Sequence, residues 1–71
     1  MQHIKIVTEY ITLGQFLKFS SIVSGGGEAK MFLLTNKILV NSFNENRRGK
    51  KLFPGDIVEI KGKKYLIELK I

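Results

Sequence analysis

The sequence contains no cysteine, a single proline and no run of apolar residues longer than about four. Without cysteine there is neither a disulfide framework nor a thiolate metal site, and a small secreted domain usually needs one of these. The longest apolar run is far shorter than the roughly twenty residues of a membrane-spanning helix. The first residues also lack the apolar stretch of a signal peptide. These absences predict a soluble cytoplasmic protein with no membrane partner.

Side chains that serve catalysis or metal binding are scarce as well. His3 is the single histidine, so a metal site around it would have only carboxylates as further ligands, and a strand-surface residue is the better interpretation. Ser20, Ser21 and Ser24 have no base nearby in sequence. We therefore expect no enzyme activity, no catalytic residues, no metal and no cofactor.

Positive charge is in excess and lies mostly in the second half. Lys and Arg outnumber Asp and Glu by 12 to 6, which gives a net charge of +6. Residues 36–71 hold nine basic and four acidic side chains, and residues 1–35 hold three and two. Such an excess favours a polyanionic partner, with nucleic acid ahead of an acidic membrane surface.

The charge is densest in NENRRGKKLFPGD, residues 44–56. Four of the five positions from 47 to 51 are cationic: Arg47, Arg48, Lys50 and Lys51. These charges repel one another, and a polyanion would relieve the repulsion while it releases its own counterions. The alternative is a solvated loop whose charge serves solubility. We interpret the run as a binding segment.

The segment ITLGQF predicts the start of a helix. Thr12 and Gln15 have the spacing of a capping box, and Ile11 and Phe16 have that of a hydrophobic staple. We expect a helix of roughly ten residues with Lys18 off its apolar face. That apolar face would consist of Leu13, Phe16, Leu17 and Ser20.

A second helix is predicted after the glycine run of residues 25–27, because consecutive glycines are unfavourable inside a helix. Glu28 would lie in its first turn, and Asn36 would be a left-handed cap at its end. Its apolar face would consist of Ala29, Phe32 and Leu33. Gly25, Gly26 and Gly27 lack the Lys-Ser/Thr pair of a nucleotide-binding loop. They fit either a backbone contact to an RNA phosphate or a tight turn between helices.

Short strands are predicted at residues 3–10, at a sheet edge, and at residues 38–40, 57–60 and 65–71. Pro54-Gly55 fits a type II turn. Together these elements predict a single domain over residues 1–71 of the α+β class. It would be a two-helix unit packed on a small, mostly antiparallel β-sheet.

The motifs ITLGQFLKFSSIVSGGGEAKMFLLTNKILVNS and LFPGDIVEI, taken in order, resemble the RNA-binding domain named after ribosomal protein S-four, the alpha-L RNA-binding motif. The resemblance covers about residues 11–60 and is greatest to short YaaA-type members, which share ITLGQFLK and the RRGKKL run. It implies structured RNA bound along the helical pair and the adjoining loop. The RNA-contacting side chains that it implies are Lys18, Lys30, Lys37 and Asn41, together with Arg47, Arg48, Lys50 and Lys51 of the basic run.

The chain departs from the family pattern at three places. Thr12 replaces an Arg, and the glycines at 25–27 replace Ser-Arg-Ser. Two expected arginine contacts are therefore missing, which shifts RNA binding toward the basic run. Asn41-Ser42 replaces the usual Asn-Gly turn, and we expect a longer loop there in place of a two-residue hairpin.

The sequence thus predicts a monomeric, non-enzymatic module for structured RNA, with ribosomal RNA as one candidate and DNA less favoured. Base readout would need exposed groups, and Asn41 and Phe43 are the candidates. The alternative is a small protein adaptor that binds a partner through an apolar edge of the sheet or helix pair, its basic charge serving solubility.

Overall fold

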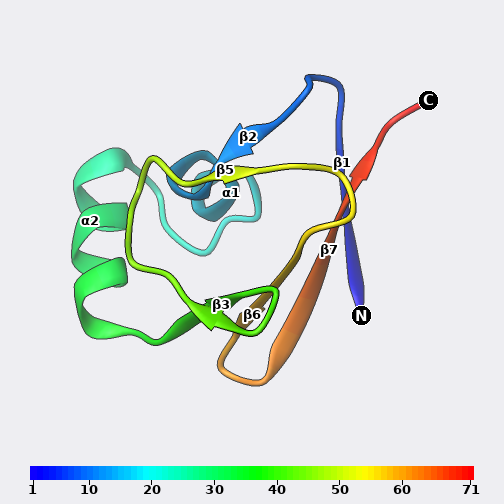
Figure 1. Cartoon of the computed structure of the whole chain (residues 1–71). Helices are drawn as coiled ribbons and strands as arrows, with labels where there is room; N and C mark the ends of the chain where they lie inside the picture. Colours follow the sequence, from blue (N-terminus) through cyan, green and yellow to red (C-terminus); the bar gives the residue numbers. More distant parts are fainter.

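The computed structural model describes residues 1–25 and 27–71. Figure 1 shows the chain with two helices on one side of a small sheet. The elements in chain order are β1 Gln2–Ile6, β2 Ile11–Thr12, α1 Leu13–Phe19, α2 Gly26–Thr35, β3 Ile38–Val40, β4 Phe43–Asn44, β5 Lys51–Leu52, β6 Ile57–Ile60 and β7 Lys63–Leu69. Within the described part of the chain, neither helix is long and apolar enough to cross a membrane.

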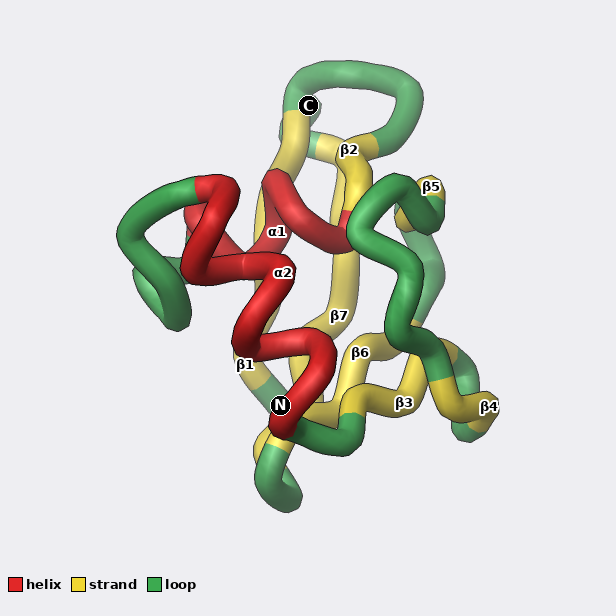
Figure 2. The backbone as a smooth tube through the Cα atoms, turned by 90° about the vertical axis from the view of Figure 1, so that its left-hand side faces the viewer, coloured by secondary structure: helices red, strands yellow, loops and turns green.

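The main sheet has five strands in the order β1-β7-β6-β3-β4. β1 runs parallel to β7, and the other neighbouring pairs are antiparallel. β2 and β5 form a separate antiparallel pair. In Figure 2 both helices lie on the viewer's side of β1 and β7, so they cover one face of the sheet. The predicted α+β class with a mostly antiparallel sheet is confirmed.

The first and last strands differ in length from the prediction. β1 lies at the sheet edge, as expected, but it ends at Ile6. β7 begins at Lys63, before the predicted start, because Lys61 and Gly62 turn the chain within two residues. Their φ angles of 52° and 80° are both positive, which suits the right-handed twist of a hairpin.

The connection between β3 and β4 is also tight, so the prediction of a longer loop was wrong. Val40 pairs with Phe43, and the two residues between them have φ angles of 51° (Asn41) and 74° (Ser42). Asn41 holds this conformation through its side-chain amide. The amide accepts the Ile57 N–H at 2.9 Å and donates to Asp56 at 3.0 Å.

The predicted type II turn is present at Pro54-Gly55. The Asp56 N–H donates to the Phe53 carbonyl at 2.9 Å, and Gly55 has a φ of 100°. A left-handed φ of this size favours glycine. The Asp56 carboxylate also accepts the Phe53 N–H at 2.8 Å, so the same aspartate closes this turn and supports Asn41.

Helix α1 starts with the predicted capping box. The Thr12 hydroxyl accepts the Gln15 N–H at 3.2 Å, and the Gln15 side chain accepts the Thr12 N–H at 2.8 Å. The helix has seven residues, fewer than expected. It ends after Phe19 because the next residues turn away, with Ser21 at a φ of 61° and the Ser20 hydroxyl donating to the Phe16 carbonyl.

Helix α2 spans Gly26–Thr35, so it includes part of the glycine run that was expected to precede it. The Glu28 carboxylate reaches back and accepts both the N–H and the hydroxyl of Ser24 at 2.6 Å, which anchors the first turn. At the other end Asn36 is extended, with φ −127° and ψ 144°. The predicted left-handed cap is therefore wrong; the Asn36 side chain donates to the Phe32 carbonyl instead.

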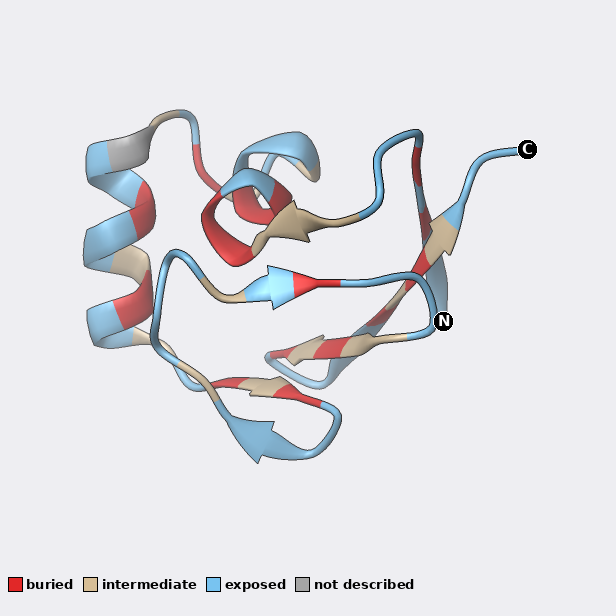
Figure 3. Ribbon diagram, turned by 45° about the horizontal axis from the view of Figure 1, so that its top comes forward, coloured by how far each residue is buried: buried red, intermediate tan, exposed pale blue. Residues whose placement is uncertain are grey.

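The core lies between the helices and the sheet, where Figure 3 shows buried positions facing inward from both. Phe16 of α1 packs edge-on against Tyr65 of β7, with ring centroids 5.3 Å apart. The predicted apolar faces are confirmed for Leu13, Phe16 and Leu17 of α1 and for Ala29 and Leu33 of α2, which are all buried. The sheet side of the core also includes Ile4, Ile6, Ile38, Val40, Val58, Ile60 and Ile67.

We predict that Thr12→Ala lowers the free energy of unfolding by about 1 kcal/mol, because it removes the hydroxyl that caps α1. In a domain of this size that corresponds to a melting temperature lower by about 4–8 °C. Thermal unfolding followed by circular dichroism measures it. Thr35→Ala is the matched control, since the Thr35 hydroxyl donates back to the Met31 carbonyl and accepts the side-chain amide of Asn36, and neither partner is a backbone N–H at a helix start. Equal melting temperatures for the two variants would contradict the capping role.

Candidate nucleic-acid interface

The basic run is fixed to the start of α1 by its backbone. The Leu13 N–H donates to the Lys50 carbonyl at 2.7 Å, and the Gly14 N–H donates to the Arg48 carbonyl at 2.9 Å. Lys51 continues into β5, opposite Thr12. The first amides of a helix have no partner within the helix, and here the basic run supplies two of the acceptors. Its cationic side chains are therefore presented from an ordered backbone.

Gly14, which no motif in the sequence indicated, allows this close approach. A Cβ at position 14 would lie 2.6 Å from Cγ of Arg48 and 3.4 Å from its carbonyl oxygen. A larger residue would push the basic run away from the helix. The only signal in the sequence is a glycine at the second position of a strongly capped helix, where alanine would be the better helix former.

Four of the predicted cations come together around three adjoining hollows. Lys18 and Arg48 line one hollow, beside Gly14. Arg48 and Lys30 line the next. Lys37 lines the third, which shares Asn46 and Leu33 with the second. We call this surface of Lys18, Lys30, Lys37 and Arg48 the basic face.

Four separate parts of the chain build the basic face. In Figure 2 the segment between β4 and β5 runs beside α1 and α2 on the viewer's side. Lys18 comes from α1, Lys30 from α2, and Arg48 from this segment, while Lys37 directly precedes β3. The fold thus places cations from both halves of the chain on one surface.

Arg47 has an acidic partner. Its side chain donates to Glu45 at 2.9 and 3.1 Å, and its backbone N–H donates to the same carboxylate at 3.1 Å. Hydrogen bonds from Arg47 lower the pKa of Glu45 from 4.5 to about 2, and those same bonds raise the pKa of Arg47. The mutual repulsion expected in the basic run is thus reduced inside the chain.

The Glu45 pKa gives the pH range of this effect. A carboxylate whose pKa is lower in the folded state stabilises that state above its unfolded pKa. The contribution from Glu45 is therefore complete above about pH 4.5 and is lost as the pH falls toward about 2. At neutral pH Glu45 is ionised and Arg47 is held beside it.

The last two cations of the run lie beside the basic face. Neither Lys50 nor Lys51 lines the three hollows. Lys50 is half-buried, and the Lys51 ammonium lies 4.9 Å from the centre of the Tyr10 ring. Tyr10 in turn contacts Phe53, with ring centroids 5.5 Å apart. Their contribution to RNA binding stays a prediction.

The remaining predicted contacts lie elsewhere. Asn41 is at the tip of the β3–β4 hairpin, where its amide is hydrogen-bonded to Asp56 and Ile57. Gly25 and Gly27 are at the start of α2, and neither lines the three hollows. Gly26 lies outside the described residues. RNA contacts by Asn41 and the glycines stay predictions. The same holds for base stacking by Phe43, which is exposed on β4.

The fold and the basic face are those of a small α+β domain that presents a cationic surface from a helical pair. The S4 domain family matches residues 4–68, and the chain belongs to this family. It is also similar to the probable ribosome maturation protein RlbA of Bacillus subtilis (strain 168), with 56% identity over 59 residues that cover 83% of each chain. The resemblance drawn from the motifs is thereby confirmed.

Gly14→Ala should reduce stability relative to a second glycine variant. The new methyl would overlap Arg48, and overpacking costs about 1–3 kcal/mol. Gly27→Ala is the matched control, because its methyl meets nothing within 4 Å and helical alanine gains about 0.5–1 kcal/mol over glycine. Urea unfolding should rank Gly27→Ala above Gly14→Ala by at least about 1 kcal/mol. The reverse order would show that the close approach is unimportant.

Proposed function

We propose that this protein is a non-enzymatic RNA-binding module that holds structured RNA on its basic face and acts in ribosome maturation. The observation that carries the proposal is the meeting of Lys18, Lys30 and Arg48 around adjoining hollows. Membership of the S4 domain family supports RNA as the ligand. The Bacillus subtilis relative is a probable ribosome maturation protein, which supports a role in ribosome maturation here and would place the protein in the cytoplasm.

The geometry suits phosphates at fixed positions. The Arg48 backbone is bonded to α1, and Lys18 and Lys30 project from helices. Cations on an ordered scaffold lose less conformational entropy on binding than cations on a free loop. A folded RNA likewise holds its phosphates in a defined arrangement, and its duplex parts are recognised mainly through shape and backbone contacts. We therefore favour structured RNA over an extended single strand.

The side chains of this surface suit binding more than catalysis. The Lys and Arg groups of the basic face bind phosphate as point charges or as a planar fork of donors. Glu45, the acid that lies next to it, has a pKa of about 2. It is ionised at neutral pH and cannot serve as a general acid, which needs a pKa near the working pH.

A salt-series titration against an RNA hairpin tests the electrostatic part. If about four to six phosphates are neutralised, log affinity should fall against log salt with a slope of about −3 to −5. Lys18→Ala with Lys30→Ala should weaken binding and make the slope shallower by about one to two. Duplex DNA of equal length, added as a competitor, measures the preference for RNA.

The matched control for this titration is Lys63→Ala with Lys64→Ala. It removes the same charge from exposed positions beside the β6–β7 turn, where these lysines line a different hollow with Met1 and Gln2. Equal losses for the two double variants would mean that net charge, and not the basic face, governs binding. A slope near zero for the unaltered protein would contradict RNA binding and favour the protein adaptor.

Glu45→Gln should tighten RNA binding severalfold and steepen the salt slope by about one, because it frees one cation for phosphate. The glutamine oxygen can still accept the Arg47 N–H, so the loop keeps its shape. Glu59→Gln on β6 is the control, since it changes the charge equally at a position opposite Lys64. Tighter binding by both variants to the same extent, or weaker binding by Glu45→Gln, would contradict a local role for Glu45.

A further inference from the structure

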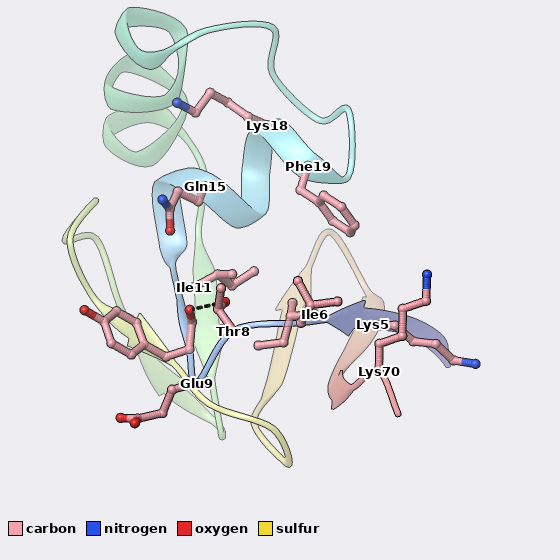
Figure 4. Close-up of a pocket in the computed structure, with 11 residues that line it drawn as sticks. Lys5, Ile6, Thr8, Glu9, Ile11, Gln15, Lys18, Phe19 and Lys70 are labelled. Carbon is pink, nitrogen blue, oxygen red and sulfur yellow. Dashed lines mark hydrogen bonds between the residues drawn. The ribbon is translucent and has the colours of Figure 1, made fainter.

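A larger hollow adjoins the basic face on the other side of α1. It lies between α1, the segment after β1 and the residue that follows β7. Its apolar lining includes Ile6, Val7, Tyr10, Ile11 and Phe19. Figure 4 shows the Phe19 ring directed from the end of α1 toward the side of the hollow where Ile6 and Ile11 lie.

Phe19 is unusually accessible for a residue of this size. The residue is 64% exposed, whereas Phe16, one turn earlier on the same helix, is fully buried. Val7, across the hollow, is 75% exposed. Single exposed apolar residues are common on protein surfaces, but here an accessible aromatic ring stands in a concave apolar site. Such a ring offers a flat face to a planar ligand.

The charge around the hollow is positive. Lys5, Lys18 and Lys70 line it, against the single carboxylate of Glu9. Gln15 and Lys18 also line the hollow that contains Arg48. In Figure 4 the Lys18 side chain extends from α1 toward α2, and Lys5 and Lys70 lie at the opposite end. The apolar hollow is therefore continuous with the basic face and has cations at both of its ends.

We propose that this hollow takes an unpaired base of the bound RNA, stacked on the ring of Phe19, while Lys18 and Lys5 or Lys70 bind the phosphates on either side. This inference rests on the proposed function. A nucleic-acid strand fits the three cations better than an acidic or neutral apolar peptide does, because the strand carries a negative phosphate at every nucleotide. Base stacking on aromatic side chains accepts any of the four bases.

The site gives the two surfaces different tasks. The basic face would hold the folded part of the RNA through its phosphates. The Phe19 hollow would hold an unpaired nucleotide where it leaves the RNA duplex. Unpaired nucleotides at loops, bulges and ends are the parts of RNA whose bases are accessible to aromatic side chains. The protein would therefore prefer a junction between paired and unpaired RNA over a continuous duplex.

The test uses two RNA hairpins that carry the same four-nucleotide 3′ extension, one with bases and one abasic. Both hairpins have the same phosphates, so a difference in affinity measures the contribution of the bases to binding. The unaltered protein should bind the base-bearing hairpin about fivefold or more tightly. A 2-aminopurine in the extension should change its fluorescence when it stacks.

Phe19→Ala and Phe19→Leu should both abolish the preference and the fluorescence change, with affinity for the abasic hairpin unchanged. The second variant keeps apolar bulk and removes only the aromatic face. Phe19→Tyr should retain the preference. Met31→Ala is the matched control, because Met31 is also an exposed apolar residue, 60% accessible, and lies on α2 outside the hollow.

Three results would overturn the inference, and they are distinguishable. Equal affinity of the unaltered protein for the two hairpins would show that the hollow binds no base. RNA binding by the basic face would remain supported. A preference that survives Phe19→Ala and Phe19→Leu would place the base elsewhere, with Phe43 as the first alternative. No binding to either hairpin at low salt would contradict both the proposed function and the base site.

Discussion

The hydrogen bonds from the first amides of α1 to the carbonyls of Arg48 and Lys50 connect the fold to the candidate site. They satisfy donors that a helix leaves unpaired at its start, so the basic run contributes to the stability of the helix. In return, the helix holds the basic run in one position. Gly14 is the residue that permits the contact, since any side chain there would meet Arg48.

This arrangement explains how so small a domain presents a defined cationic surface. A chain of 71 residues has a small core and limited stability, and a flexible loop of like charges would lower both order and stability. Here the backbone of the charged segment is paired with α1, and Glu45 neutralises one of its cations. Arg48 of the same segment lines hollows with Lys18 of α1 and with Lys30 of α2.

Predictions that depended on near neighbours in sequence were largely correct. The capping box of Thr12 and Gln15 and the Pro54-Gly55 turn each involve residues within one turn of backbone, so their geometry follows from local chemistry. The Asn41-Ser42 hairpin was wrongly predicted to be longer. Its left-handed Asn41 is held by Asp56 and Ile57, which lie 15 and 16 positions away, and local turn preferences carry no information about such partners.

The amino-acid sequence by itself determined the α+β class, the two apolar helix faces, the excess of positive charge and the family, because periodicity, charge and motif order are properties of the chain read in one dimension. Only the tertiary structure decided which cations share a surface. Lys18, Lys30 and Arg48 meet because α1, α2 and the segment before β5 pack together. The accessible ring of Phe19 likewise belongs to a hollow that forms only when β1, α1 and the end of β7 are brought together.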